Sequence, residues 1–249
     1  MPDRRLENEE AVGQVRFIID EAFRPLFPEA LVGIVVARGI DNRRGVSGAQ
    51  AELAAAATLA TTAIGDADLA TLPDVAPWRE AYRRFGVKPS RYRSSIEGLL
   101  RTARSGEVRS INPLVDLYNA VSLRHLLPCG GEDLGAIDGD LRLTIAAGGE
   151  PFIPLGSTEE LPPAAGEVVY ADDAGVVCRA WNWREADRTK LTPETTRAVL
   201  VIEALPPRTE DHVRAACDDL AAMATMSLGA TCRVVLLGAN GVLETSLDA

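Results

Sequence analysis

Several polar side chains stand inside otherwise apolar sequence, where a buried polar group needs a partner or a ligand. The densest group is the segment CRAWNWR at 178–184, which places Asn182, Trp183 and Arg184 side by side. Tryptophan and arginine together can stack a base or a ribose and bind a phosphate. The same segment could also be a tryptophan-anchored core from which arginines reach solvent. The residue types alone leave both interpretations open.

Further polar residues lie in comparable surroundings. They are Asp116 and Asn119 in VDLYN, Glu132 and Asp133 after a predicted turn at 128–131, Thr189, Thr192, Thr195 and Thr196, and Glu203 at the end of a buried apolar run. His125 ends a predicted helix, where it could be a general base or a cation favoured by the helix dipole. We expect His212 at the surface. Two isolated histidines and four widely spaced cysteines predict no metal site and reduced, buried thiols.

Familiar cofactor and nucleophile motifs do not occur. The sequence has neither a Walker loop nor GxGxxG, so it predicts neither ATP nor a dinucleotide as cofactor. Residues 45–49 (GVSGA) only approach a nucleophile elbow, because Ala49 stands where the second glycine belongs. A serine hydrolase is therefore disfavoured.

Positive charge is concentrated in one part of an acidic chain. The formal net charge is −10, which argues against a general nucleic-acid binder. Residues 78–109 nevertheless hold nine basic and three acidic side chains, a net charge of +6. Such a patch can bind a phosphate backbone, although an arginine-rich, solvated helix face would have the same composition.

The 249 residues, 47% of them hydrophobic, suffice for a sizeable core. No apolar run reaches the roughly 18 residues that span a bilayer. The N-terminal MPDRRLENEE has no apolar signal-peptide core, so we expect a cytoplasmic protein.

The hydrophobic pattern predicts mainly helices in the first half and strands in the second. Predicted helices cover 49–64, 77–85, 95–105, 113–127 and 213–224, and predicted strands cover 15–19, 31–40, 141–145, 168–170, 176–178, 199–202 and 232–237. Ser94 and Asn112 are the predicted N-caps of two helices. Because strands and helices do not alternate regularly, the pattern indicates an α+β fold rather than a doubly wound sheet.

A series of short motifs occurs in the order in which one known family carries them. The motifs are FGVKPS, RSSIEGLL, INPLVDLYN, DLGAIDGDLRL, GGEPFIPLG, GEVVYADD, CRAWNWR, LTPETT and VIEAL. Together they resemble the B3/B4 editing module of the phenylalanyl-tRNA synthetase beta subunit, and the flanking segments fit free-standing members. The resemblance implies a layered β/β/α sandwich that hydrolyses the ester of a mischarged tRNA. We expect three parts: an N-terminal α/β segment at 1–76 packed on the core, the editing core at 77–205, and a C-terminal helix and strand at 206–249 that complete the same globule.

The resemblance carries over residue by residue, with departures. Asn119 matches the asparagine of the family's VDxxN helix, and Asp133 an aspartate of the next segment. Glu203 matches a glutamate that recognises the tyrosine hydroxyl in the synthetase. Gly130 stands where the family has a pocket histidine, and 182–184 replace a glycine-rich turn. A smaller amino acid than tyrosine is therefore a candidate substrate.

These considerations assign hypothetical roles. The predicted catalytic residues are Asn119 and Asn182, which would orient the ester or water, and Glu203, which would recognise the amino acid. The predicted substrate-binding residues are Arg184, Trp183, Asp133 and Thr192. The predicted RNA-binding residues are Arg83, Arg84, Lys88, Arg91 and Arg93. We expect the acceptor end of a tRNA as partner, neither DNA nor a membrane, and no ligase activity. The alternative is a non-catalytic module that binds tRNA or an aminoacyl ligand. The sequence predicts no oligomeric state.

Overall fold

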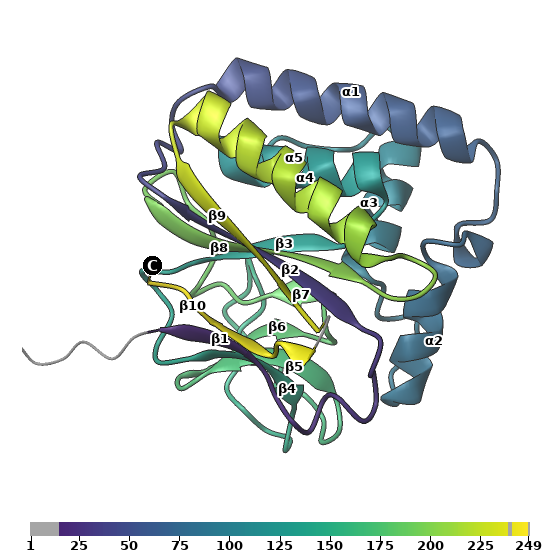
Figure 1. The fold of residues 1–249 in the computed structure, drawn as a ribbon. Coiled ribbons are helices and arrows are strands. Elements are labelled where there is room, and N and C mark those ends of the chain that lie inside the picture. Colours follow the sequence, from purple (N-terminus) through teal and green to yellow (C-terminus); the bar gives the residue numbers. More distant parts are fainter. Residues whose placement is uncertain (1–14, 239–240, 249) are drawn as a thin grey trace, which may run out of the picture.

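Two β-sheets stack face to face, and helices cover the outer face of the smaller sheet (Figure 1). The computed structural model describes residues 15–238 and 241–248. The charged segment 1–10, on which the expectation about a signal peptide rests, lies outside these residues. The layering confirms the predicted α+β class and the β/β/α sandwich.

The smaller sheet is antiparallel throughout, in the order β3-β8-β2-β9. Its strands are β3 (Cys129–Asp133), β8 (Arg197–Ala204), β2 (Leu31–Arg38) and β9 (Thr231–Leu237). β2 pairs with β8 over its full length, with Leu31 opposite Ala204 and Arg38 opposite Arg197. Six consecutive residues of β2 are buried. Both faces of this sheet are covered, which is why its central strands are apolar runs without alternation.

The larger sheet has the order β10-β1-β4-β5-β6-β7. Its strands are β10 (Glu244–Ser246), β1 (Arg16–Ile19), β4 (Leu141–Ile145), β5 (Val168–Asp172), β6 (Gly175–Arg179) and β7 (Arg184–Glu185). β1 and β4 are parallel, and the other neighbours are antiparallel. Both sheets therefore combine strands from the beginning, the middle and the end of the chain. The division into three sequence segments stays a prediction.

Helices pack on the smaller sheet and on one another. They are α1 (Val46–Ile64), α2 (Ala76–Arg84), α3 (Ser95–Arg104), α4 (Pro113–His125) and α5 (Glu210–Leu228), with a 3-10 turn η1 (Leu69–Thr71). The predicted caps are confirmed: the Asn112 side chain accepts from Val115 N at 3.1 Å and that of Ser94 from Glu97 N at 3.4 Å. No helix in the described ranges is both long and apolar enough to cross a membrane.

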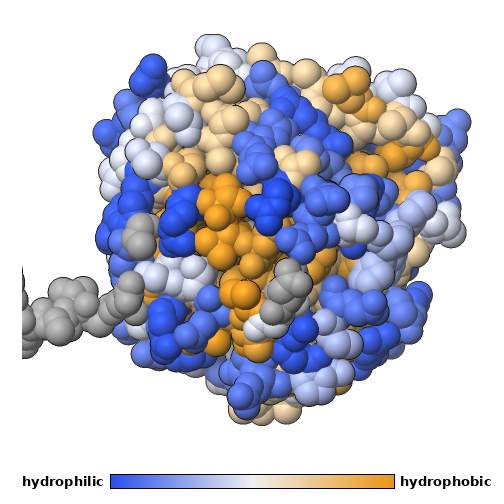
Figure 2. All heavy atoms as spheres, viewed as in Figure 1, coloured by the Kyte–Doolittle hydropathy of each residue, from blue (hydrophilic) through white to orange (hydrophobic). Residues whose placement is uncertain are grey.

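The predicted turn at 128–131 is wrong, because these residues enter strand β3. Gly130 lies opposite Val201 and Gly131 opposite Leu200 of β8. Two adjacent glycines favour a turn locally, yet pairing with a buried neighbouring strand overrides that preference. At the other edge of this sheet, β9 leaves Val234 and Val235 half-buried. Figure 2 shows apolar residues gathered where β9 runs in Figure 1.

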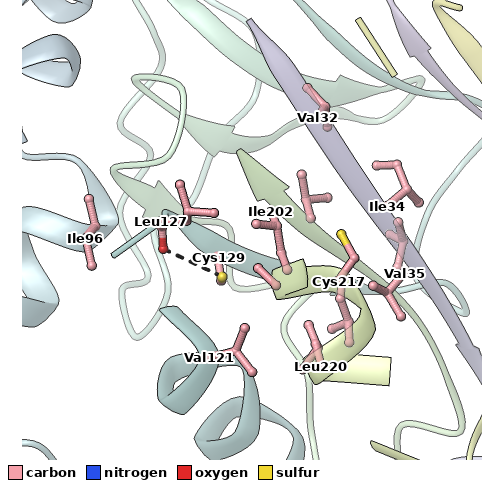
Figure 3. Packing of buried hydrophobic residues seen from close by; sticks show 14 of the residues in the cluster. Val32, Ile34, Val35, Ile96, Val121, Leu127, Cys129, Ile202, Cys217 and Leu220 are labelled. Carbon is pink, nitrogen blue, oxygen red and sulfur yellow. Dashed lines mark hydrogen bonds between the residues drawn. The ribbon is translucent and has the colours of Figure 1, made fainter. Parts of the chain in front are cut away.

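α5 approaches the sheet most closely at Gly33 of β2. A Cβ atom built there would lie 2.3 Å from Cys217 Sγ and 2.7 Å from Val213 Cγ1. Figure 3 shows Cys217 and Leu220 of α5 beside Ile34 and Val35 of β2 in the shared core. The missing side chain at Gly33 thus sets the distance between helix and sheet.

We expect Gly33→Ala to destabilise the fold by about 1–3 kcal/mol, because the added methyl group forces α5 outward. The melting temperature, followed by circular dichroism, should fall by several degrees. Gly48→Ala is the matched control, since nothing lies within 4 Å of a Cβ at this α1 position. That change should be neutral or stabilising by up to about 1 kcal/mol. Equal melting temperatures for both variants would contradict the close approach.

Candidate functional site

A small cavity lies between the sheets beside the start of α3. Its wall consists of Ser95 of α3, Cys129, Gly130, Gly131 and Glu132 of β3, Leu141 of β4, Tyr170 of β5, Val177 and Cys178 of β6, Trp181 and Asn182 of the next turn, Glu185 of β7, and Val201 and Glu203 of β8. The cavity volume is about 30 Å³, room for about two water molecules. Ser95, Gly130, Asn182 and Glu185 are the half-buried members of the wall, so they form the mouth.

The turn between β6 and β7 aims two side chains at this cavity. Ala180 and Trp181 both have left-handed backbone conformations, with φ of 45° and 64°. Such a conformation costs a non-glycine residue of order 1–3 kcal/mol and needs support from its surroundings. The buried Glu167 supplies it: Oε1 accepts from Ala180 N at 2.9 Å, and both oxygens bind Arg179, at 2.8 and 3.0 Å. The strained turn is therefore fixed in place.

Aromatic packing fixes the same turn from the other side. The Trp181 ring is buried, with ring centroids 4.7 Å from Phe27 and 5.0 Å from both Phe23 and Trp78. Trp78 belongs to α2, so its contact with Trp181 links the start of the basic segment to the cavity wall. The Trp181 indole N–H points at Glu203.

Glu203 accepts three hydrogen bonds at the centre of the site. Oε1 accepts from the Tyr170 hydroxyl and from the Trp181 indole N–H, both at 2.5 Å, and Oε2 accepts from Asn182 Nδ2 at 2.7 Å. Burial raises the pKa of Glu203 to about 7, although these three donors favour the ionised form. A carboxyl group with this pKa can accept or release a proton at neutral pH.

Asn182 connects the cavity to the basic segment. Its Oδ1 accepts from the Tyr82 hydroxyl at 3.0 Å and from Ser95 N at 3.3 Å, while its Nδ2 donates to Glu203. One amide thereby joins α2, the N-terminus of α3 and β8. The donors on one side and the carboxylate on the other fix which way the amide points.

A second acidic group, which we did not predict as a site, consists of Glu132 and Glu185. One oxygen of each carboxyl group, Oε2, is buried without a hydrogen-bond partner in the described residues. Burial, and next the charge of Glu185, raises the pKa of Glu132 well above its usual range. Burial likewise raises the pKa of Glu185. The charge of Glu185 therefore disfavours ionisation of Glu132.

Gly130 makes room for this pair. A Cβ atom at Gly130 would lie 2.8 Å from Glu185 Oε1. The resemblance expected a histidine at this position, but Glu185 occupies the space that such a side chain would need. The sequence signal for Glu185 was weak, because a single acidic residue after an arginine is common on exposed edges.

The predicted RNA-binding residues do not share one surface. Arg83 and Lys88 line a hollow of about 410 Å³ with Arg79, whereas Arg84 lines a different hollow and lies over the Phe27 ring at 5.4 Å. Several of the basic residues have carboxylate partners: Arg83 binds Glu80 at 3.1 Å, and Arg93 lies 3.8 Å from the buried Glu97. Lys88 and Arg91 form no ion pair with a described residue.

Trp183 and Arg184 lie beside this basic surface. Trp183 packs edge-on against Tyr92, with ring centroids 4.6 Å apart. The guanidinium of Arg179 lies 5.6 Å from the Trp183 centroid and that of Arg184 5.7 Å. Arg184 is exposed and has no ion-pair partner within the described ranges. In the described part of the chain, the cluster places an aromatic ring and a cation without an ion-pair partner directly after Asn182 in sequence.

Asn119, Asp133 and Thr192, like Trp183 and Arg184, lie outside the cavity wall. Asn119 is half-buried on α4. Asp133 accepts from the Thr195 hydroxyl at 2.6 Å, and that hydroxyl accepts from Thr192 N at 2.9 Å. Asp133 and Thr192 therefore tie the loop before β8 to the end of β3. Their contacts give them a role in holding this loop.

The structure does not place His125 where it could act as a general base in the cavity. His125 Nε2 lies 3.1 Å from Asp219 Oδ2, on helices α4 and α5 rather than in the cavity. His212 caps α5 with Thr209. Among the residues that the structure describes, no three His, Cys, Asp or Glu side chains are grouped to hold a metal ion.

We expect Glu203→Gln to change how stability depends on pH. The folded-state pKa of about 7 exceeds the ordinary value of 4.5, so the folded protein binds this proton more tightly than the unfolded chain. The proton on Glu203 stabilises the fold fully below pH 4.5. As the pH rises to 7, about 3 kcal/mol of this stabilisation is lost. Glutamine has no such proton, although its NH₂ group would face the Asn182 NH₂ at every pH.

The measurement is the free energy of unfolding in urea at pH 4.5, 5.5 and 7. Wild type should lose about 3 kcal/mol relative to Glu203→Gln across this range. The exposed Glu160 provides the control, Glu160→Gln, which should keep the wild-type pH dependence. Parallel pH profiles for wild type and Glu203→Gln would refute the raised pKa.

A fragment of the phenylalanyl-tRNA synthetase beta subunit from Pyrococcus horikoshii, comprising its N-terminal part, is similar in structure at 13% sequence identity, with a TM-score of 0.42. The similarity covers 95% of this chain and 57% of that one. No curated protein matches the sequence. The family model described as the B3/4 domain matches residues 77–223, more than half of the chain. The chain belongs to the B3/4 domain family.

Proposed function

We propose that the chain binds the acceptor end of a mischarged tRNA and hydrolyses its aminoacyl ester in the cavity between the sheets, in trans and without ligase activity. One observation carries the proposal: Asn182 joins the buried Glu203 to Tyr82 and Ser95. Tyr82 and Ser95 belong to the segment in which positive charge is concentrated. A reactive carboxyl group and a surface for phosphates are thus coupled in a member of this family.

The mouth of the cavity has groups suited to an ester. Ser95 Oγ is buried without a partner in the described residues, and Asn182 Nδ2 has a second N–H beyond the one given to Glu203. Both can donate to the carbonyl oxygen as it becomes negative. Glu203 would take a proton from water while the water oxygen bonds to the carbonyl carbon. The bond to the ribose oxygen then breaks, and the proton passes to that oxygen.

The nucleic-acid part would lie on the adjoining surface. Lys88, Arg91 and Arg184 have no ion-pair partner within the described ranges, so their charges are available to phosphates. The terminal adenine would stack on Trp183 by displacing the exposed Arg184, whose guanidinium lies 5.7 Å from the ring centroid. The strongly negative remainder of the chain would keep RNA from binding elsewhere.

The size of the cavity favours a small aminoacyl group. A cavity of roughly 150 Å³ holds benzene, whereas this one has a volume of about 30 Å³. Leu141, Val177 and Val201 give part of the wall an apolar character. We therefore propose alanine-sized side chains as substrates rather than phenylalanine or tyrosine.

The first test is deacylation of tRNAs that carry alanine, serine, phenylalanine or tyrosine. We expect the small esters to be hydrolysed at least about tenfold faster, because an aromatic ring needs a larger cavity. Asn182→Ala should lower turnover by roughly 10²-fold, as for the loss of a carbonyl donor. Gln50→Ala removes an exposed amide on α1 and should leave turnover unchanged. If no ester is hydrolysed but tRNA still binds, the protein is a binding module instead.

The second test concerns the basic surface. The double variant Lys88→Ala/Arg91→Ala should weaken tRNA binding and reduce the slope of log K against log salt by roughly 1.5–2, because two phosphate contacts are lost. Arg214→Ala on α5 is the control, since its partner Glu210 lies 3.3 Å away on the same helix. An unchanged slope for the double variant would exclude this surface from RNA binding.

A further inference from the structure

The proposed hydrolysis leaves the two carboxyl groups of Glu132 and Glu185 without a task. Glu132 is only 5% exposed, and Oε2 of each residue has no partner among described residues. A buried polar atom without a hydrogen bond costs of order 1–3 kcal/mol. Both residues line the same cavity. The contacts of the two carboxyl groups are with each other, of Glu132 with the Thr189 hydroxyl and of Glu185 with the Cys178 thiol, none of them a cation. Two acidic side chains that line one cavity without a cationic partner in the described part of the chain indicate that a positively charged donor binds there.

No neighbouring cation satisfies the pair. Arg188 is the positive group that acts on Glu132, but its guanidinium is already bound to Asp172, with Nη1 at 2.9 Å from Oδ2. It also donates to the carbonyl oxygens of Ala136 and Gly175. The remaining groups that interact with the pair are neutral or negative: Tyr118, Cys178, Tyr170, Thr189 and Glu203. The pair therefore lacks a positive partner of its own.

We propose that Glu132 and Glu185 form a binding site for a primary ammonium group, the α-ammonium of the aminoacyl ester. This inference rests on the proposed function for the identity of the ester. It narrows the substrate class to esters with a free amino group and a small side chain. An ammonium has three N–H donors, and charge-assisted hydrogen bonds to carboxylates are the strong ones.

The position of the pair suits such a substrate. Glu185 and Gly130 belong to the half-buried mouth, while Glu132 lies deeper. Ser95 and Asn182 are also at the mouth, so the ester carbonyl and the ammonium would bind within one opening. The side chain would then point toward Leu141 and the rest of the apolar wall.

Binding has a definite proton balance. In the proposed site, the ligand-free pair holds one proton in the hydrogen bond between the two carboxyl groups and carries one negative charge. When an ammonium binds, both carboxylates become ionised and the shared proton is released to solvent. The net charge of the pair together with its ligand stays at −1, so binding adds no net charge to the cavity. Proton release is a signature that a purely structural pair would not have.

The probe is L-alaninamide, which has the α-ammonium and small side chain of the substrate but is not an ester. L-lactamide, with a hydroxyl group in place of the ammonium, is the matched control ligand. Titration calorimetry at pH 6.5, where an α-amino group is mostly protonated, gives affinity. Repeating it in phosphate and in Bis-Tris, which both buffer at this pH but differ in ionisation enthalpy, gives the number of protons released.

We expect wild type to prefer alaninamide over lactamide by roughly 10- to 100-fold and to release close to one proton. Glu132→Gln and Glu185→Gln should lose the preference and the proton release, while Glu160→Gln keeps both. Gly130→Ala should weaken alaninamide binding by pushing Glu185 aside. Absence of alaninamide binding, or equal affinity for both ligands in wild type, overturns the inference without relying on any variant that could misfold.

The same measurements separate this inference from the proposed function. A preference for alaninamide without hydrolysis of any aminoacyl-tRNA would retain the ammonium site and reject the deacylase. Hydrolysis with full alaninamide preference in Glu132→Gln and Glu185→Gln would reject the ammonium site and retain the deacylase.

Discussion

The site depends on one buried carboxyl group that must be hydrogen-bonded from both sheets. Glu203 belongs to the smaller sheet, yet it accepts hydrogen bonds from the Tyr170 hydroxyl of the larger sheet and from the Trp181 indole N–H in the turn between β6 and β7. Because a buried carboxylate without donors is costly, these contacts fix how the sheets meet. The left-handed turn and its support by Glu167 follow from that need, since only this backbone brings the indole and the Asn182 amide to the same carboxyl group.

The distribution of charge is the one that the proposed aminoacyl-tRNA ligand would need. Basic residues without ion-pair partners lie outside the cavity, and three acidic residues, Glu132, Glu185 and Glu203, line it. The acceptor end presents phosphates and, a few bonds farther, an ammonium. A surface that is positive outside and negative inside would orient this ligand in one direction. The net charge of −10 conceals this arrangement, because only the separation of the two signs matters.

The sequence was informative wherever local signals agreed with tertiary packing. Periodicity located most helices and strands, and the caps at Ser94 and Asn112 were confirmed. The sequence-based prediction failed at β3, where two adjacent glycines, Gly130 and Gly131, predicted a turn. In the structure, both residues pair with β8 as part of an extended strand. Within the site, Asn182 and Glu203 stood out as polar residues in apolar runs. Glu185 did not stand out, because its burial depends on its contact with Gly130, which has no side chain in the way. That contact joins two distant parts of the chain, so no local sequence pattern predicts it.

Motifs shared with a family preserve the fold as well as the chemistry. Asp133 and Thr192 match the family's order, yet here they hold a loop through Thr195. Asn112 and Asn42 continue this network toward the N-terminus of α4. These contacts hold the loop whatever the substrate is. The chemistry particular to this protein is therefore to be sought where it departs from the family, at Gly130 and the glutamate that fills the vacated space.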